Sequence, residues 1–217
     1  MPRPSLDGKK SPPFQRRTPK QKRAQAKYNA VLDACTQVLS SQGYRRTTIL
    51  ELSLESGVAV PTLYQYFENK EAILLTWMDR TIEKMLQAVH QLKAGLPDDT
   101  PLQHIVRILL SGAFTAFREF QPATASLLQE MPQTLSRHML TSLEENILQM
   151  LKTLFPEAVA RLGSAEAAET KLRVLVKMVS GFLLLSLLNG ENHHRLMEQA
   201  PVLERIILVY LQDLGLS

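Results

Sequence analysis

Apolar side chains recur every three to four residues along most of the chain, which is the spacing of amphipathic helices. No segment alternates apolar and polar residues as a half-buried strand does, and no internal repeat is visible. The pattern therefore predicts an all-α protein of about nine helices. The expected ranges are 24–42, 48–56, 60–67, 70–93, 101–117, 122–132, 137–155, 164–189 and a last helix after Pro201.

Segment 47–70 carries the start and stop signals of two short helices joined by a turn. Thr48 and Glu51 have the spacing of a capping box, in which the hydroxyl and the carboxylate each bind a free backbone N–H. Gly57 can adopt the positive φ that ends the first helix. Pro61 fits the first turn of the second helix, because its missing N–H would have no partner there. Two helices joined by a short turn with glycine indicate a helix-turn-helix.

The second of these helices has one apolar face and one face suited to DNA. Leu63 and Phe67 mark the inward face. The opposite side and its flanks carry small polar groups and two phenols: Pro61, Thr62, Tyr64, Gln65 and Tyr66. Hydroxyls and amides can bind phosphates or base edges, and no carboxylate precedes Glu68 to repel them. Asn69 can cap the next helix, where Lys70 and the free amides could hold a phosphate. A buried helical hairpin also fits this pattern.

Segment 28–74 resembles the DNA-binding domain of the TetR family of bacterial transcriptional regulators. The residues that carry the resemblance are Gly43-Tyr44, Thr47-Thr48, Gly57-Val58, Pro61-Thr62-Leu63-Tyr64, Tyr66-Phe67 and Asn69-Lys70-Glu71. Carried over by position, the resemblance implies base contacts by Val60, Pro61 and Tyr64. It implies contacts with the phosphate backbone by Thr48, Thr62, Gln65, Tyr66 and Lys70. Arg45 and Arg46, just before the motif, could touch the DNA backbone or be solvated surface residues.

The sequence departs from the usual family pattern at several positions. Ala59 stands where the family usually has Ser or Thr, so the second helix loses a side-chain N-cap, worth about 1 kcal/mol. Ser53 and Ser56 replace the usual alanines. Val60 lies nearer to the inward face than a base contact should, which makes it the weakest of the implied DNA contacts.

Positive charge is concentrated at the N-terminus. Residues 1–27 hold nine Lys or Arg against Asp7 alone, a net charge of +8, so a total of +4 leaves −4 for the remainder. Such a tail indicates a polyanionic partner, and nucleic acid is favoured over lipid because the tail has no apolar face to insert. We expect a disordered basic tail over 1–22, a helix-turn-helix domain over 23–72, and a helical regulatory and dimerisation domain over 73–217.

Beyond residue 95 no motif identifies a function. The resemblance implies that this part forms a homodimer and encloses a small apolar ligand. The candidate ligand contacts are Phe114, Phe117, Arg118, Met131, His138, Met139 and Met150. Aromatic and Met residues at helical spacing are, however, usually ordinary core. The candidate dimer contacts, on the nearly all-apolar segment 174–188 and on the last helix, are Val174, Met178, Val179, Leu183, Val202, Ile206, Val209 and Tyr210.

Other classes of function find no support in the sequence. A single cysteine, Cys35, allows no intrachain disulfide, fits a reducing cytoplasm and is expected to be a small core residue. The basic, Pro-rich N-terminus does not read as a signal peptide, and segment 174–188 is too short and too interrupted to span a membrane. Hydrolase, phosphate-loop and zinc motifs are absent and the histidines share no helix face, so no enzyme, metal site or cofactor is expected.

The sequence leaves three functions open. The first is a dimeric transcriptional repressor that a small molecule releases from a palindromic operator of double-stranded DNA, as two-fold symmetry would require. The second is an architectural DNA binder without a ligand. The third is an interaction module whose basic tail binds acidic partners. The resemblance favours the first.

Overall fold

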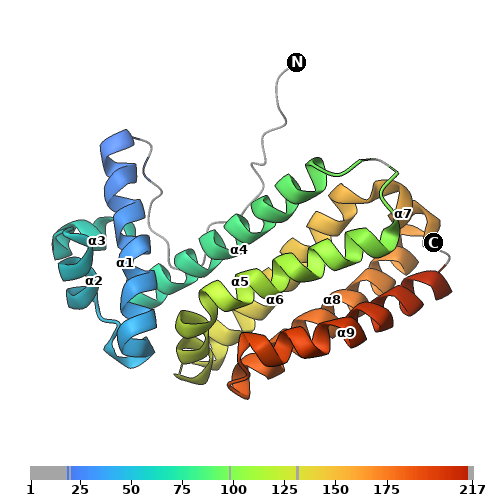
Figure 1. Cartoon of the computed structure of the whole chain (residues 1–217). Helices are drawn as coiled ribbons and strands as arrows, with labels where there is room; N and C mark the ends of the chain where they lie inside the picture. Colours follow the sequence, from blue (N-terminus) through green and yellow to red (C-terminus); the bar gives the residue numbers. More distant parts are fainter. Residues whose placement is uncertain (1–18, 20, 98, 131, 215–217) are drawn as a thin grey trace. The chain divides into compact units, whose positions relative to one another are not determined.

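The computed structural model describes residues 19, 21–97, 99–130 and 132–214, without the side chains of 116–126, 128, 129, 134 and 135. Within these residues the regular structure is helical, which confirms the all-α prediction (Figure 1). The helices are α1 (Lys22–Arg46), α2 (Ile49–Ser56), α3 (Val60–Tyr66), α4 (Lys70–Ala94), α5 (Leu102–Glu130), α6 (Gln133–Leu154), α7 (Pro156–Arg161), α8 (Ala165–Leu188) and α9 (His193–Asp213). The chain divides into two compact units, Met1–Met78 and Asp79–Ser217, and most of the tail expected over 1–22 lies outside the described residues.

The helices of the second unit begin and end at different residues from those predicted. The sequence predicts a break near Pro122, but α5 continues through this position, because the surrounding Ala and Leu residues favour helix despite the missing backbone donor. The last helix is predicted to begin after Pro201, yet α9 already begins at His193. The side chain of Asn192 caps it by accepting a backbone N–H at 3.0 Å. The short helix α7 is missing from the prediction.

The first unit is held together by the inward faces of α1, α2, α3 and the start of α4. Cys35 is fully buried on α1, which confirms it as a core residue. Phe67, directly after α3, stacks on Tyr28 of α1 with ring centroids 5.0 Å apart. Trp77 is 2% exposed, and its indole N–H donates to Thr36 Oγ1 over 2.8 Å. These contacts fix α3 and α4 against α1.

The second unit has a core shared by helices that are distant in the sequence. Its buried apolar cluster includes Val106, Leu110, Phe114, Leu148, Leu172, Val176, Leu203, Ile207 and Leu211. Arg107 of α5 pairs with Glu204 of α9 at 2.9 Å, and Tyr210 of α9 donates its hydroxyl to the Lys171 carbonyl of α8 over 3.1 Å. These contacts join α5, α8 and α9 (Figure 1). None of the described helices is both long and apolar enough to cross a membrane.

Candidate nucleic-acid interface

Local signals set the geometry of α2, the turn and α3. The Thr48 hydroxyl accepts the backbone N–H of Glu51 at 3.1 Å, which confirms the threonine half of the predicted capping box. Gly57 ends α2 with a φ of +66°, in the left-handed region that favours glycine. Pro61 lies in the first turn of α3, and Ala59 provides no side-chain cap, both as the sequence indicates. The helix-turn-helix geometry is therefore present.

The inward and outward positions predicted for α3 are correct at most residues. Leu63 is fully buried and Phe67 is 1% exposed, so the inward face lies against the first unit's core. Tyr64 is 44% exposed, and Pro61 and Gln65 are also exposed. Thr62 and Val60 are half-buried. A hydroxyl, an amide and a phenol thus line the outward side of a short helix, which is the chemistry that base edges and phosphates require.

Tyr66 differs from the expectation that it flanks the exposed face. It is only 9% exposed, and its ring lies edge-on to that of Tyr28, with centroids 5.9 Å apart. The helical periodicity of α3 alone cannot predict this burial, because the ring that covers Tyr66 is that of Tyr28 on α1. Any contact of Tyr66 with a DNA backbone is therefore restricted to the small part of the residue that remains accessible.

Lys70 begins α4 beside a tyrosine that it contacts twice. Its ammonium donates to the Tyr44 carbonyl at 3.2 Å and lies 3.9 Å from the centroid of the Tyr44 ring. The side chain of Asn69 caps α4 by accepting the N–H of Ala72 at 2.8 Å, as predicted. Burial, and then the nearby Glu71 carboxylate, raise the pKa of Tyr44 above its ordinary value of 10.0. An ammonium has three donors, so Lys70 can donate to the Tyr44 carbonyl and still bind a phosphate.

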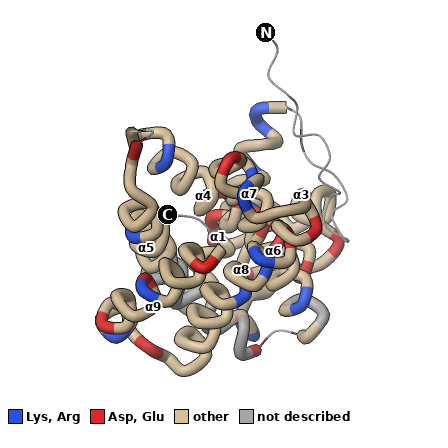
Figure 2. The backbone as a smooth tube through the Cα atoms, turned by 90° about the vertical axis from the view of Figure 1, so that its right-hand side faces the viewer, with Lys and Arg blue, Asp and Glu red and all other residues tan. Residues whose placement is uncertain are grey.

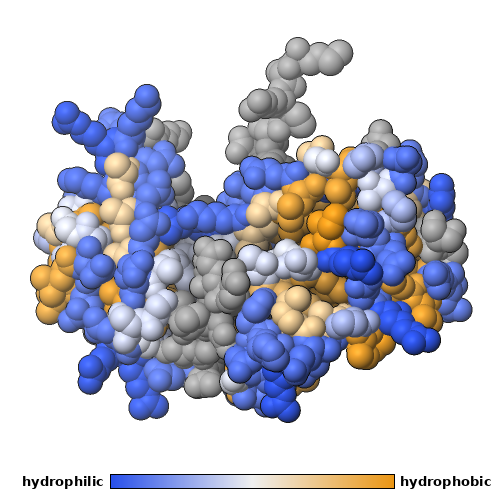
Figure 3. Space-filling model, viewed as in Figure 1, coloured by the Kyte–Doolittle hydropathy of each residue, from blue (hydrophilic) through white to orange (hydrophobic). Residues whose placement is uncertain are grey.

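The surface around α2 carries basic, polar and apolar side chains side by side. Arg45 and Arg46 are exposed at the end of α1, and Thr48 is exposed at the start of α2. Leu50 and Leu54 are 61% and 68% exposed, one turn apart on α2, at positions where the apolar pattern predicts no exposed surface. Figure 3 shows apolar surface over α2 and α3. Along the described helices acidic and basic residues are interspersed rather than segregated (Figure 2).

Of the predicted ligand contacts that the structure describes, three are buried and His138 is half-buried. Phe114 is 1% exposed and lies against Phe182 with ring centroids 6.4 Å apart, while Met139 and Met150 are at most 9% exposed. The Nε2 atom of His138 is buried without a hydrogen-bond partner, so an unsatisfied polar atom exists at this position. The other candidates fall on residues or side chains outside the described set: Phe117, Arg118 and Met131.

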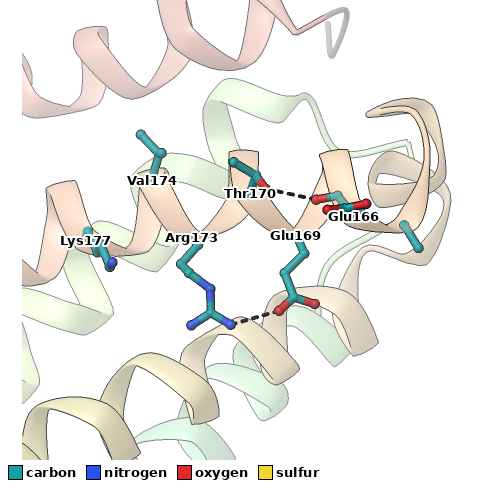
Figure 4. Close-up of a pocket in the computed structure, with 7 residues that line it drawn as sticks. Glu166, Glu169, Thr170, Arg173, Val174 and Lys177 are labelled. Atoms are coloured by element: carbon teal, nitrogen blue, oxygen red, sulfur yellow. Dashed lines mark hydrogen bonds and ion pairs between the residues drawn. The ribbon is translucent and has the colours of Figure 1, made fainter.

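A pocket among the described residues lies elsewhere, along the start of α8 (Figure 4). It has a volume of about 570 Å³ and is lined by Ala165, Glu166, Glu169, Thr170, Arg173, Val174 and Lys177. Arg173 donates to Glu169 at 2.8 Å and also to Glu144 and Glu145 of α6. The pocket is therefore edged by an ion-pair network and does not coincide with the predicted ligand contacts. In the described part of the chain no three His, Cys, Asp or Glu residues are grouped to hold a metal.

The predicted dimer contacts divide into an exposed and a half-buried set. Those more than 45% exposed are Val174, Val202, Ile206 and Val209. Those half-buried, partly packed against the core of their own unit, are Met178, Val179, Leu183 and Tyr210. Further apolar residues of α8 and α9 that the sequence analysis does not name are also exposed: Leu185, Leu188 and Met197. The two helices thus carry an apolar surface that their own unit leaves uncovered.

Comparison with known proteins identifies the family of the first unit's domain. The family model described as bacterial regulatory proteins, tetR family, matches residues 31–76. The chain is 30% identical over 96 residues to the fatty acid metabolism regulator protein of Bacillus subtilis (strain 168), which covers 44% of this chain and 47% of that protein. The chain thus spans about half the length of this curated relative.

Solved structures are similar over most of the chain. A TetR-family transcriptional regulator from Mesorhizobium loti superposes with a TM-score of 0.66 at 17% identity, over 89% of this chain and 97% of that one. The transcriptional regulator FadR from Bacillus subtilis, in complex with stearoyl-CoA, superposes with a TM-score of 0.59 at 18% identity, over 86% and 97%. At such identities these likenesses concern the fold, and both units take part in it.

Proposed function

We propose that this chain, which belongs to the TetR family of bacterial transcriptional regulators, binds a palindromic operator as a homodimer and leaves it when a small apolar ligand binds. The observation that carries the proposal is α3, a helix with a buried inward face and with Pro61, Tyr64 and Gln65 exposed. A helix of this kind can enter a major groove. The proposal gives the chain no catalytic role and places it in the cytoplasm, with the DNA it binds.

The roles of the individual residues follow from their positions. Base contacts are assigned to Val60, Pro61 and Tyr64 at the start and outward side of α3. Phosphate contacts are assigned to residues of α3 and of the segments before and after it: Arg45, Arg46, Thr48, Thr62, Gln65, Tyr66 and Lys70. Phosphate contacts fix the register of a protein on DNA, while base contacts select the sequence.

The homodimer is supported by the uncovered apolar surface of α8 and α9. Val202, Ile206 and Val209 recur at four- and three-residue intervals and are 48–62% exposed. Contiguous apolar surface of this kind usually marks an interaction site. A two-fold dimer buries the same surface from both copies and presents two copies of α3, so the operator should be an inverted repeat.

Selection from a random library of DNA duplexes tests the DNA-binding function. We expect the full chain to enrich an inverted repeat whose half-sites are about one helical turn or more apart. Enrichment of AT-rich or bent DNA without a consensus would favour an architectural binder. Failure to retain any duplex, with retention of acidic polymers, would favour an interaction module that uses its basic tail.

The ligand is proposed to be apolar with one polar anchor. His138, with its buried and unpartnered Nε2, is a candidate for that anchor. Because one structure of similar fold holds stearoyl-CoA, a long-chain acyl-CoA is the first probe to use. We expect it to release the selected operator and to raise the melting temperature, since it binds only the native state. Coenzyme A without an acyl chain is the control. If a wider set of apolar ligands also changes neither quantity, the chain is a ligand-independent binder.

A further inference from the structure

Two serine hydroxyls of α2 bind both backbone polar groups of Val58, the residue between the turn and α3. Ser53 Oγ donates to the Val58 carbonyl at 2.7 Å. The Val58 N–H donates to Ser56 Oγ at 3.3 Å, and Ser56 Oγ in turn donates to the Leu52 carbonyl. Val58 itself is 5% exposed, so these groups lie in a largely dry environment where an unmet hydrogen bond is costly. We name Ser53 and Ser56 the serine clamp.

Helix α3 has few other local restraints at its start. Its N-cap residue, Ala59, makes no side-chain hydrogen bond, and Pro61 has no N–H to contribute. The first turn relies on the Ala59 carbonyl, which accepts from Thr62 at 2.8 Å and from Leu63 at 3.2 Å. A helix of seven residues is marginal by itself, because few bonds offset the cost of its nucleation. Its direction therefore depends on how the chain enters it at Val58 as well as on the packing of Leu63 and Phe67.

We propose that the serine clamp positions α3 for base recognition, in place of the missing N-cap. This inference rests on the proposed function. The clamp ties the last residue before Ala59 to α2, so that a change at Ser53 is transmitted to the outward side of α3 through the backbone. The bases that Tyr64 would contact require accurate placement, whereas phosphate contacts through flexible cations tolerate a shift. Loss of the clamp should therefore lower specificity more than general DNA affinity.

Binding titrations with the selected operator and with random duplex test the clamp. Ser53→Ala should bind the operator about five- to tenfold more weakly, which corresponds to one lost hydrogen bond, and random DNA within about twofold of the unaltered chain. Ser53→Thr keeps the hydroxyl and should retain the operator affinity within about twofold. Ser41→Ala is the matched control, because Ser41 also donates to a helix carbonyl, that of Gln37 at 2.7 Å, but within α1.

The ratio of operator to random-DNA affinity decides the outcome. An unchanged ratio for Ser53→Ala would overturn the clamp as a positioning device, whether both affinities stay the same or both fall equally. This holds with or without a lower melting temperature. If Ser53→Ala does not fold at the assay temperature, Ser56→Ala is measured in its place and should show the same fall in the ratio. If the unaltered chain prefers no sequence, the proposed function itself fails, and that result is distinguishable from a failure of the clamp.

Discussion

The two units differ in how much apolar surface their helices leave exposed. In the first unit, the side chains of Thr48 and Asn69 cap the starts of α2 and α4, and Gly57 ends α2. In the second unit, Asn192 likewise caps α9, but α8 and α9 expose an apolar surface that includes Ile206. The first unit thus offers an outward helix and exposes apolar side chains mainly at Leu50 and Leu54 of α2. The second offers a surface that another apolar surface must cover.

The largest expected effect comes from charging the apolar surface of α9. Ile206→Glu places a carboxylate between Val202 and Val209, where a second copy would bury it without a partner. We expect a monomer in sedimentation velocity and an operator affinity lower by about 100-fold or more, because several kcal/mol are lost. Gln212→Glu, which adds the same charge at another exposed position of α9, should remain dimeric. A dimer that persists in Ile206→Glu would place the interface elsewhere.

The next largest effect separates the two kinds of contact within the first unit. Tyr64→Ala should cost roughly 1–3 kcal/mol on the operator and much less on random DNA, if Tyr64 faces bases. Lys70→Ala should weaken both DNAs about equally, and it should also lower the melting temperature because Lys70 holds the Tyr44 carbonyl. Fluorescence anisotropy on both duplexes measures these differences. An equal loss of affinity for both duplexes in Tyr64→Ala would mean that Tyr64 contacts the DNA backbone rather than the bases.

A smaller effect concerns the tail, which adds positive charge to the nearly neutral segment 28–70. Residues 28–70 hold three Lys or Arg against four Asp or Glu. Deletion of residues 2–20 should therefore lower operator affinity but leave the preferred sequence unchanged. The log–log salt slope should fall by about one or two per subunit, because each lost phosphate contact contributes about 0.9. A tail of the same length with Gln for Lys and Arg should behave like the deletion. An identical slope would show that the tail binds another partner.

The smallest effect is an acid sensitivity of the second unit. Hydrogen bonds from Lys152, and then from Arg173, lower the pKa of Glu169 below its ordinary value of 4.5. The stabilisation by Glu169 is therefore present above pH 4.5 and is lost as the pH falls through the lowered pKa. Glu169→Gln should lower the melting temperature near neutral pH, and this difference should shrink as the pH falls through the lowered pKa of Glu169. Glu157→Gln, at an exposed position of α7, is the control; a pH-independent effect of Glu169→Gln would contradict the explanation.

What the sequence predicts correctly is mostly local. The caps at Thr48 and Asn69 and the turn at Gly57 depend on a few neighbouring residues, so their signals are readable in the sequence. The buried face of α3, with Leu63 and Phe67, follows from helical periodicity. For the same reason the helix-turn-helix is recognisable from the order of its residues alone.

What the sequence does not predict depends on distant residues. Tyr66 is buried because Tyr28, on another helix, covers it. Lys70 donates a hydrogen bond to the carbonyl of Tyr44, which is 26 residues earlier in the chain. The serine clamp requires a turn geometry that brings the Val58 carbonyl back to α2. In the second unit the periodic pattern finds helices but not their partners, so the pocket on α8 and the continuation of α5 are both missed.

The most direct test of the account measures how many chains bind one selected operator, by sedimentation with labelled duplex. We predict two chains on the intact inverted repeat, and a loss of about 100-fold or more in affinity when one half-site is scrambled, since half of the base contacts disappear. One chain per duplex, with no effect of scrambling either half-site, would contradict a dimer that reads a palindrome through two copies of α3.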